Sequence, residues 1–379
     1  METLFNIGIA LLCLAASMGI NRVFVCFNFY NHIDFSGKRY LHIDGIRGIA
    51  ALLVVLNHAV FSLSNNGFNP LSVNTSNFWV FAHAGDVGVQ IFFCITGFLF
   101  FDKIIKTGNK INWEMFFVSR VKRLVPMYMI ASTIVLVLTL MWSHGGQDLT
   151  TTARQAINLF GFGFFGSDIW VNGFRTYSLN AVIWTLPYEW KFYCMLPVIC
   201  AAIRFKSIAV IGSVLSVGYA ANDLYSGQVV WVYFISGALS AILFNRMKMV
   251  SVMLSSNKIT NNFFSAASAL TIIYLLYTMF SGYGWERFLI TTLLFNVIVM
   301  TKPSVFTFKP LVYLGEASYS SYLLHLIINA LVIKFIGFIF NLNNISAVGF
   351  WTLILSLVSI TTIVTAYTFK YVEYRFIKK

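Results

Sequence analysis

The chain has 379 residues, 58% of them hydrophobic and only 10% charged, and its formal net charge is +13. Soluble domains are about half apolar and about a quarter charged, so this composition excludes a soluble enzyme and indicates an integral membrane protein with many spans. In a soluble protein such an excess of cations would suggest nucleic acid. Here the Lys and Arg residues fall mainly in short loops, so we expect no nucleic-acid partner. We interpret these cations first as topology signals and second as a site for a polyanionic cofactor.

Apolar runs of helical length occur eleven times along the chain. They cover roughly residues 5–27, 42–63, 81–101, 124–142, 181–203, 207–222, 228–244, 263–281, 286–301, 315–340 and 347–369. These runs predict an all-α fold, a polytopic integral membrane helical bundle of about ten core spans plus one extra N-terminal span.

The first apolar run could be mistaken for a signal peptide, but its only cation, Arg22, follows the apolar core instead of preceding it. We therefore expect residues 1–37 to form an additional anchor span and residues 38–379 to form the membrane domain. The five cysteines lie in apolar segments without the spacing of metal ligands, so we expect inert packing residues and no metal site. They are Cys13, Cys26, Cys94, Cys194 and Cys200.

The distribution of cations predicts the orientation of the chain. Twenty of the 26 Lys and Arg residues fall in segments on one side of the predicted spans, whereas the opposite loops hold only Arg154 and Arg175. This bias predicts that the twenty cations and the C-terminus are cytoplasmic and that Met1 lies outside.

The connection 143–180 is then extracytoplasmic, and it is rich in glycine and aromatic residues, among them Trp170, Phe174 and Tyr177. Such a loop could hold a sugar by ring stacking and amide hydrogen bonds. An interfacial half-helix with an aromatic belt explains the same residues equally well.

The segment "DGIRGIAALLVVLNH", residues 44–58, carries Arg47 near its start and His58 deep in its apolar run. Arg47 and His58 are eleven residues apart, which places them on nearly one helix face about 16 Å apart along the axis. Arg47 could meet an anion at the cytoplasmic surface while His58 handles a proton within the membrane. The alternative is a snorkelling arginine and a core histidine bonded to a neighbour. Gly45 and Gly48 would let another helix or a ligand approach closely.

The segment "GDVGVQIFFCITGF", residues 85–98, places Asp86 near the outer end of a span. Asp86 or Gln90 could orient the histidine by a hydrogen bond, as carboxylates do for catalytic imidazoles. Asp86 could equally be an interfacial residue without such a role.

In "RVKRLVP", residues 120–126, Arg120 and Arg123 share a helix face at the predicted cytoplasmic surface. A pair of guanidinium groups suits bidentate binding of phosphate oxygens. Simple positive-inside anchoring needs only their charge, and this stretch by itself favours that interpretation.

The segment "WTLPYEWKFY", residues 184–193, places Glu189 and Lys191 at a span entrance next to Trp184 and Tyr188. A carboxylate inside a membrane is a functional candidate, and the competing interpretation is a structural ion pair. Further along, "GEASYSSYLLH", residues 315–325, forms a polar stripe that could line a cavity or pack by interhelical hydrogen bonds. The stripe consists of Ser318, Tyr319, Tyr322 and His325.

In their order and residue patterns, these five segments together resemble the motifs of the membrane acyltransferase family 3. Members of this family are polytopic proteins that O-acylate cell-surface carbohydrates. The resemblance runs from about Arg39 to Phe376. It includes the basic residue and histidine separated by ten positions, the double phenylalanine, the paired arginines, the Trp–Thr–Leu–x–x–Glu block and the late Ser–Tyr–x–x–Tyr–Leu–x–His block.

The chain also departs from the family pattern. Gln90 stands where many members have aspartate, Thr96 and Thr185 replace serines, and no proline follows Glu373. These differences weaken an essential acid role at position 90 and leave Glu373 without a predicted role. The N-terminal span is additional, and a hydrolase-like extracytoplasmic partner enzyme would be a separate protein.

The resemblance implies a multi-pass protein of the bacterial inner membrane that transfers an acyl group, expected to be acetyl, from acyl-CoA to a hydroxyl of a surface polysaccharide. O-antigen or its lipid-linked oligosaccharide precursor is the expected acceptor. The implied partners are membrane lipid, acetyl-CoA as donor substrate and this glycan. The resemblance implies no bound cofactor and no metal.

The resemblance also implies roles for the residues singled out above. His58 would be the general base, or would form a transient acyl-histidine. Asp86 and Glu189 would be the other catalytic residues, and Arg47, Arg120 and Arg123 would hold the donor's phosphates. The expected substrate-binding residues are Trp184, Tyr188, Ser318, Tyr319 and His325.

Two other classes of protein remain open. A transporter or flippase of lipid-linked sugars would also bury Arg, Glu and His in a many-span bundle, although it would more often show internal repeats. A non-catalytic partner in surface-polymer assembly would tolerate substitution of His58 and the arginines.

Overall fold

The computed structural model describes residues 2–35, 39–66, 78–108, 110–143, 145–203, 230–278, 280, 282–340 and 345–378, with short stretches between 210 and 225. Across these residues the only β-structure is one hairpin of two-residue strands, so the predicted all-α fold is confirmed. The chain divides into two compact units, which we describe separately. Unit 1 comprises Met1–Asn57, Asn74–Ile111 and Cys200–Ser318, and unit 2 comprises His58–Val73, Asn112–Ile199 and Tyr319–Lys379.

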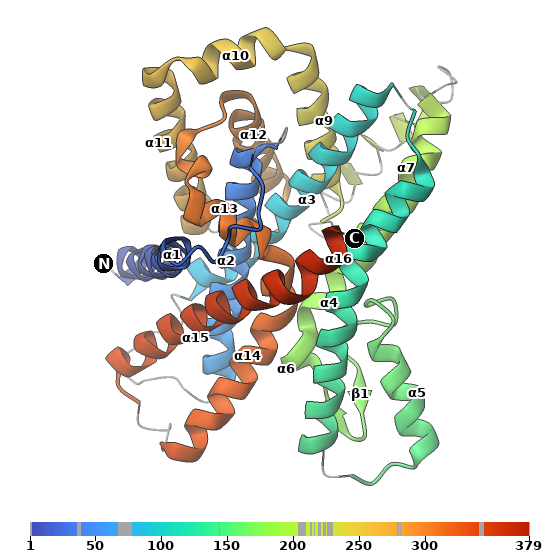
Figure 1. Cartoon of the computed structure of the whole chain (residues 1–379), viewed down its shortest axis with the longest axis vertical. Helices are drawn as coiled ribbons and strands as arrows, with labels where there is room; N and C mark the ends of the chain where they lie inside the picture. The colour runs from blue at the N-terminus through green and yellow to red at the C-terminus, as the bar shows by residue number, and fades with distance from the viewer. Residues whose placement is uncertain are drawn as a thin grey trace. The chain divides into compact units, whose positions relative to one another are not determined.

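Unit 1 is built from helices that lie early and late in the sequence (Figure 1). They are α1 (Glu2–Cys26), the first part of α2 (Leu41–Asn65), α3 (Trp79–Thr107), α9 (Val232–Arg246), α10 (Lys248–Ser256), α11 (Lys258–Tyr277), α12 (Trp285–Thr301), the 3-10 helix η3 (Ser304–Thr307) and α13 (Lys309–Glu316).

Unit 2 takes up the last turns of α2 and the middle and end of the chain. Its other elements are α4 (Trp113–Trp142), α5 (Leu149–Leu159), strands β1 (Trp170–Val171) and β2 (Phe174–Arg175), α6 (Tyr177–Asn180), the 3-10 helix η2 (Ala181–Thr185), most of α7 (Leu186–Ile203), α14 (Ser318–Ile339), α15 (Ala347–Thr368), the π-helical turn η5 (Phe369–Glu373) and α16 (Tyr374–Lys378).

Seven helices in the described part of the chain are long and apolar enough to cross a membrane. They coincide with seven of the predicted runs and contain α1, α2, α3, α4, α11, α14 and α15. The bent pair α9 and α10, with an angle of 87° between its helices, would make an eighth. Helices α7 and α12 lie in two more of the predicted runs without meeting the same criteria, and the run 207–222 is described only in short stretches. The protein is therefore a multi-pass membrane protein, although eleven spans are not established.

Glycines allow the helices of unit 1 to pack at short distance. A Cβ atom on Gly97 of α3 would lie 2.1 Å from the carbonyl oxygen of Phe234 on α9, and one on Gly237 would lie 2.0 Å from that of Cys94. At this crossing the rings of Phe93 and Phe234 stack with their centroids 4.3 Å apart. Only a residue without a side chain fits between two helix backbones at such a distance.

One end of unit 1 is basic. α10 lies between α9 and α11 at this end, as Figure 1 shows. The Ser251 hydroxyl of α10 donates a hydrogen bond of 2.8 Å to the carbonyl of Met300, so the end of α12 is also there. Lys106 near the end of α3, Arg246 at the end of α9 and Lys258 at the start of α11 lie in the helix ends that meet here.

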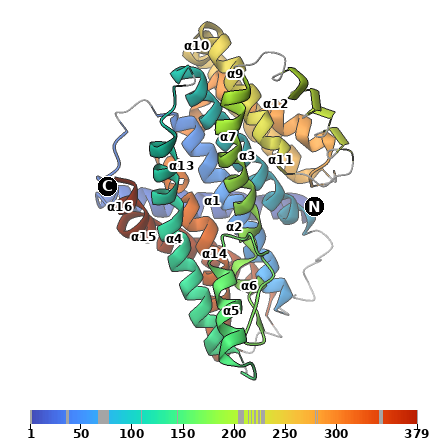
Figure 2. The ribbon, with the colours of Figure 1, turned by 90° about the vertical axis from the view of Figure 1, so that its right-hand side faces the viewer.

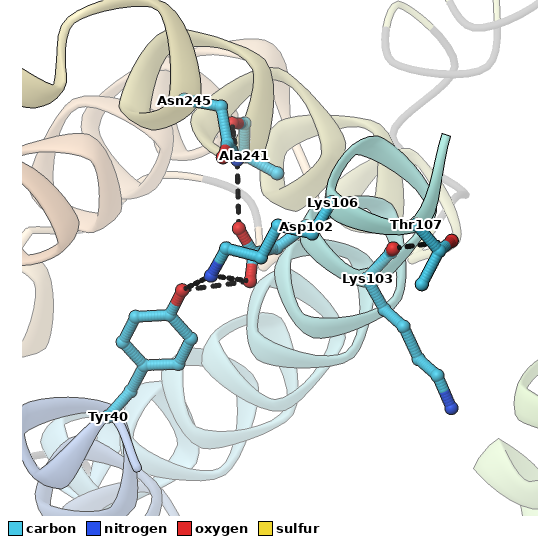
Figure 3. A network of polar contacts seen from close by, with 7 residues as sticks. All are labelled: Tyr40, Asp102, Lys103, Lys106, Thr107, Ala241 and Asn245. Atoms are coloured by element: carbon cyan, nitrogen blue, oxygen red, sulfur yellow. Dashed lines mark hydrogen bonds and ion pairs between the residues drawn. The ribbon is translucent and has the colours of Figure 1, made fainter. Parts of the chain in front are cut away.

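A buried carboxylate joins three segments at this basic end (Figure 3). The carboxylate of Asp102 accepts hydrogen bonds of 2.8 Å from the Tyr40 hydroxyl, the Lys106 ammonium and the Asn245 amide. The neighbouring Lys103 points away from this network. Three donors on one carboxylate offset the cost of burying its charge, so this network ties the start of α2 to α3 and α9.

The core of unit 2 forms where α4, α5 and α14 pack around the segment before α7. The hydroxyls of Tyr128 and Ser132 on α4 both donate to the carbonyl of Leu159 at the end of α5, over 2.7 and 3.2 Å. These bonds satisfy a carbonyl that the helix end leaves without a partner. α5 therefore lies beside the second half of α4, as Figure 2 also shows.

The connection 143–180 contains α5, the β1–β2 hairpin and α6. The hairpin is closed by two hydrogen bonds, of 2.6 and 2.8 Å, from the guanidinium of Arg175 to the carboxylate of Asp168. Arg175 thereby holds the pKa of that carboxyl below its usual 3.8. Trp170 and Tyr177 expose about half of their surface.

All five cysteines are free thiols. Cys13, Cys94 and Cys200 are buried, as predicted for packing residues, whereas Cys26 and Cys194 are exposed, so the packing prediction is wrong for these two. An apolar run does not distinguish the helix face that packs from the face that meets lipid.

Candidate active site

Unit 2 brings two histidines into contact. His58 lies near the end of α2 and His325 lies in the second turn of α14, and their ring centroids are 4.9 Å apart with the ring planes at 54°. His325 is fully buried, and His58 is half-buried. The sequence assigned a catalytic role to the first histidine and a substrate-binding role to the second, and the structure places them in one site.

The hydrogen bonding of His325 determines which of its nitrogens carries the proton. Its Nδ1 lies 2.8 Å from the carbonyl oxygen of Ser321, one helical turn earlier. A carbonyl only accepts, so the neutral ring has its hydrogen on Nδ1 and a lone pair on Nε2. In the described part of the chain Nε2 has no hydrogen-bond partner, although the atom is buried. This nitrogen is therefore available to accept a proton or a hydrogen bond.

A second polar layer lies one turn further along the same two helices. The Asn329 amide donates to the Ser62 hydroxyl over 3.3 Å, and each residue follows one of the histidines by four positions. On the other side of His325, the Tyr322 ring lies 6.3 Å from the imidazole. Its hydroxyl donates to the carbonyl of Val182 at 2.6 Å and lies 2.7 Å from the Thr185 hydroxyl. Of the polar stripe of α14, His325 thus faces α2 and Tyr322 faces the segment before α7.

A cluster of charged groups and tyrosines occupies another part of unit 2. The Tyr193 hydroxyl donates to the Glu189 carboxylate over 3.1 Å, and Tyr193 also interacts electrostatically with Arg120 and Arg123. Tyr319 donates to the carbonyl of Leu124 over 2.9 Å and interacts electrostatically with Glu189. The paired arginines and the intramembrane carboxylate, predicted separately, therefore belong to one cluster.

Helix α14 connects this charged cluster to the histidines. Tyr319 contacts the cluster and His325 follows six residues later, which corresponds to about 9 Å along the helix axis. The aromatic residues predicted for substrate binding lie on the neighbouring segment, where the rings of Trp184 and Tyr188 are 6.0 Å apart and Lys191 lies 5.8 Å from the Tyr188 ring. A ligand with a phosphate tail and a reactive end would find cations and an imidazole along one helix.

Arg47 lies in unit 1, where it is held in an ion-pair network. Its guanidinium lies 3.2 Å from the carboxylate of Asp44, which also accepts from Arg39 over 3.0 Å. The close approach predicted for Gly45 and Gly48 is made by protein backbone, because Cβ atoms there would lie 1.7 Å from the carbonyl oxygen of Phe306 and 2.4 Å from that of Leu311. The glycines therefore admit η3 and α13, and not a ligand.

Asp86 and Gln90 also belong to unit 1. The Gln90 amide donates to the carbonyl of Gly282 and accepts from the Thr291 hydroxyl over 3.1 Å, and Asp86 interacts electrostatically with Arg287. These bonds give both residues partners on α12 and the connection before it. Orientation of His58 by Asp86 or Gln90 stays a prediction. Ser318 is buried in unit 1, as the first residue of α14.

Three residues of these clusters were not singled out from the sequence. Arg287 is fully buried, Glu373 is 1% exposed and accepts a 2.9 Å hydrogen bond from the Ser320 hydroxyl, and Asn329 lies beside Ser62. The signal for Arg287 was present, because an arginine two residues into an apolar run is costly unless it is partnered or functional. Glu373 had no such signal, because it follows the last predicted run, 347–369, in a stretch rich in charged residues.

Comparison with known proteins gives a family for this architecture. The sequence model of the acyltransferase domain of family 3 matches residues 40–370, which include both histidines, the paired arginines and Glu189. No solved structure matches the chain.

Three relatives illustrate the similarity. Peptidoglycan O-acetyltransferase OatA of Listeria monocytogenes is 23% identical, with the match covering 89% of this chain and 56% of the relative. A Bacillus subtilis protein provisionally named peptidoglycan O-acetyltransferase, YrhL, is 26% identical over 87% of this chain and 54% of its own length. A provisionally named O-acetyltransferase of Staphylococcus aureus is 24% identical over 75% and 49%. The chain spans about half the length of these relatives.

The family match covers most of the chain, and it begins at Tyr40, after α1 and immediately before α2. The helical multi-pass architecture agrees with the fold that the resemblance implied. The chain therefore belongs to the membrane acyltransferase family 3.

Proposed function

We propose that this protein transfers an acetyl group from acetyl-CoA to a hydroxyl group of a cell-surface glycan, with His58 as the general base. The observation that supports this role is the contact of His58 with His325, whose Nε2 has no partner among the described residues. The two imidazoles provide one group to take the proton of the reacting hydroxyl and a second group to accept a hydrogen bond from another hydroxyl of the same sugar.

In the proposed reaction the acceptor hydroxyl gives its proton to His58 as its oxygen attacks the thioester carbonyl. The carbon–sulfur bond breaks, the acetyl group passes to the sugar oxygen, and the proton returns to the CoA thiolate as it leaves. His325 Nε2 accepts a hydrogen bond from a second hydroxyl group of the acceptor sugar and thereby positions the acceptor. Exclusion of water from this layer would protect the thioester from hydrolysis.

The donor would be held by its phosphates. Arg120 and Arg123 lie in one cluster of unit 2, about two turns of α14 from His325, and guanidinium groups bind phosphate oxygens in a bidentate manner. Glu189 and Tyr193 would hold these arginines in position. Arg47 is the third proposed donor-binding residue.

The acceptor we propose is a glycan on the extracytoplasmic side. The names of two relatives refer to peptidoglycan, which supports peptidoglycan over the O-antigen acceptor expected from the sequence. Mass spectrometry of surface glycans from cells with and without the gene would identify the acetylated polymer by the loss of acetyl groups.

The test of the catalytic assignment uses two histidine variants. His58→Ala should lower acetyl transfer by about 10²–10⁴-fold, the usual contribution of a general base. His325→Asn keeps an amide donor for the Ser321 carbonyl but removes Nε2, and should lower transfer about tenfold, as for one lost hydrogen bond to substrate. Transfer is measured on purified protein with acetyl-CoA and a glycan acceptor.

Asn66→Ala is the matched control, because Asn66 is an exposed residue just after α2. This control and both histidine variants should insert into the membrane normally. Near wild-type transfer by His58→Ala would disprove the general-base role, and a wild-type protein that never cleaves acetyl-CoA with acceptor present would favour a transporter.

A further inference from the structure

A buried arginine in unit 1 has donors that the fold does not use. Arg287, in the first turn of α12, is fully buried, and its Nη2 donates to the carbonyls of Thr278 and Phe280 over 3.3 and 3.5 Å. Its Nε and Nη1 have no hydrogen-bond acceptor in the described part of the chain. A guanidinium with a purely structural role would be expected to satisfy its whole fork, because each unpaired buried donor costs stability.

Two further polar atoms without partners belong to the same cluster. Tyr233, in the first turn of α9, is also fully buried, interacts electrostatically with Arg287, and has a hydroxyl with no partner among the described residues. The Nδ1 atom of His83 on α3 is also buried without a hydrogen-bond partner among the described residues, and His83 also interacts electrostatically with Arg287. Three helices therefore bring unsatisfied polar atoms to one place.

A hydrogen-bond acceptor lies close to these donors but forms no ion pair with Arg287 among the described residues. The carboxylate of Asp86 on α3 interacts electrostatically with both Arg287 and Tyr233. In the part of the chain that the structure describes, however, no ion pair joins Asp86 to Arg287. The connection before α12 passes next to the carboxylate, because a Cβ on Gly282 would lie 2.5 Å from its Oδ2. Asp86, His83 and Gly282 are only half-buried, so the cluster reaches the surface at this side.

The cluster lies at the end of unit 1 away from its cations. Asp86 and His83 are in the first part of α3, Tyr233 is at the start of α9 and Arg287 is at the start of α12. The opposite ends of these helices hold Lys106 and Arg246, and Lys302 directly follows α12. By the positive-inside rule the basic end faces the cytoplasm, so the cluster would face the extracytoplasmic side, where glycans are found.

We propose that Arg287, Tyr233 and Asp86 form a binding site for a hydroxyl-bearing sugar residue of the glycan acceptor. A sugar hydroxyl can accept a hydrogen bond from Arg287 or Tyr233 and donate one to Asp86. It would therefore link the donors of this cluster to its acceptor. A simple anion would be repelled by Asp86 and a simple cation by Arg287. This inference rests on the proposed function, because it identifies the site as an acceptor site.

The sharpest test is Tyr233→Phe, which removes only the hydroxyl. Because that hydroxyl has no partner in the described fold, a structural role predicts unchanged or higher thermal stability and unchanged kinetics. The acceptor-site role predicts an apparent KM for the glycan acceptor about tenfold higher, the equivalent of one lost hydrogen bond, with kcat and the KM for acetyl-CoA unchanged. Tyr274→Phe, on the exposed face of α11, is the matched control and should behave as wild type.

A binding measurement separates this proposal from the proposed function. Saturation-transfer NMR with a soluble β-linked N-acetylglucosamine tetramer should show contact with the wild-type protein and a reduced signal with Tyr233→Phe. A protein that binds the tetramer in this way but never transfers acetyl would retain the site and lose the enzymatic function. A Tyr233→Phe variant with both wild-type KM and wild-type binding would overturn the site.

Discussion

At the scale of single residues, the structure gives the intramembrane charges partners. Glu189 was predicted either as a catalytic group or as half of an ion pair, and it accepts a hydrogen bond from Tyr193, which also interacts with Arg120 and Arg123. Shared hydrogen bonds and opposite charges lower the cost of keeping such groups in an apolar region. A cluster of this kind can be both a structural element and a binding site, so function must be tested by kinetics and not by stability alone.

The donor-binding role of the arginines predicts a selective kinetic effect. Arg123→Ala should raise the apparent KM for acetyl-CoA by about 10–100-fold, because a charge-assisted hydrogen bond to phosphate contributes about 1.5–3 kcal/mol. The KM for the glycan acceptor should stay the same. Initial rates measured at varied acetyl-CoA concentration check this expectation.

Lys122→Ala provides the control for charge alone, because Lys122 is adjacent on α4 and equally half-buried. If both variants raised the donor KM equally, a general positive surface would explain the effect. An unchanged donor KM in Arg123→Ala would remove that arginine from the donor site.

At the scale of elements, short helix crossings determine where the side chains can meet. α3 and α9 approach each other at Gly97 and Gly237, and α2 approaches α13 at Gly48, where neighbouring backbones occupy the space of a side chain. These contacts place Asp86 on α3 and Tyr233 on α9 within electrostatic reach of each other. Gly45 and Gly48 in the sequence predicted a close approach to α2, but nothing in the sequence identified η3 and α13 as the approaching segments.

The crossing of α3 and α9 predicts a stability difference between two glycine substitutions. Gly97→Ala should destabilise the protein by about 1–3 kcal/mol, because the new Cβ would lie 2.1 Å from a backbone oxygen and the helices would have to separate. Gly19→Ala on α1 meets nothing within 4 Å and should be neutral or stabilising by up to about 1 kcal/mol.

Thermal unfolding in detergent, followed by circular dichroism, would measure both variants against wild type. Equal melting temperatures for Gly97→Ala and Gly19→Ala would contradict the close packing of α3 on α9. A loss confined to Gly97→Ala would support it.

At the scale of the whole molecule, the cations predict which side of the membrane each segment faces. Unit 1 has one basic end, where the ends of α3, α9 and α12 and the start of α11 lie. The positive-inside rule requires such an arrangement in a consistently oriented bundle. The same rule predicts a cytoplasmic C-terminus and an extracytoplasmic α5 with its hairpin.

Cysteine labelling tests this orientation. In a chain whose five cysteines are replaced by alanine, Ser178→Cys in α6 should react with a membrane-impermeant maleimide in intact cells, whereas Arg375→Cys in α16 should react only after permeabilisation. Both positions are exposed, so burial does not explain a difference between them. Labelling of Arg375→Cys in intact cells would reverse the predicted orientation.

The sequence predicted the class of fold and most of the candidate site. Apolar runs predict helices reliably because a lipid environment forces every backbone polar group to bond within its own segment. Spacing along one helix is also local, so the sequence alone places Tyr319, Tyr322 and His325 in one stripe of α14. The sequence predicted helix ends less accurately. The apolar run begins at residue 124, whereas α4 begins at Trp113 and therefore includes Arg120 and Arg123.

By itself, the sequence determined that this is a multi-pass helical protein of the acyltransferase family, with His58, His325, Glu189 and the paired arginines as candidates. Only the tertiary structure decided which of them meet. The contact of His58 with His325 joins residues 267 positions apart, and the cluster of Arg287 with Asp86 joins residues 201 positions apart. Such pairings depend on which helices pack together, and the packing of apolar helices in lipid follows from the shapes of whole surfaces, which no local pattern of residues specifies.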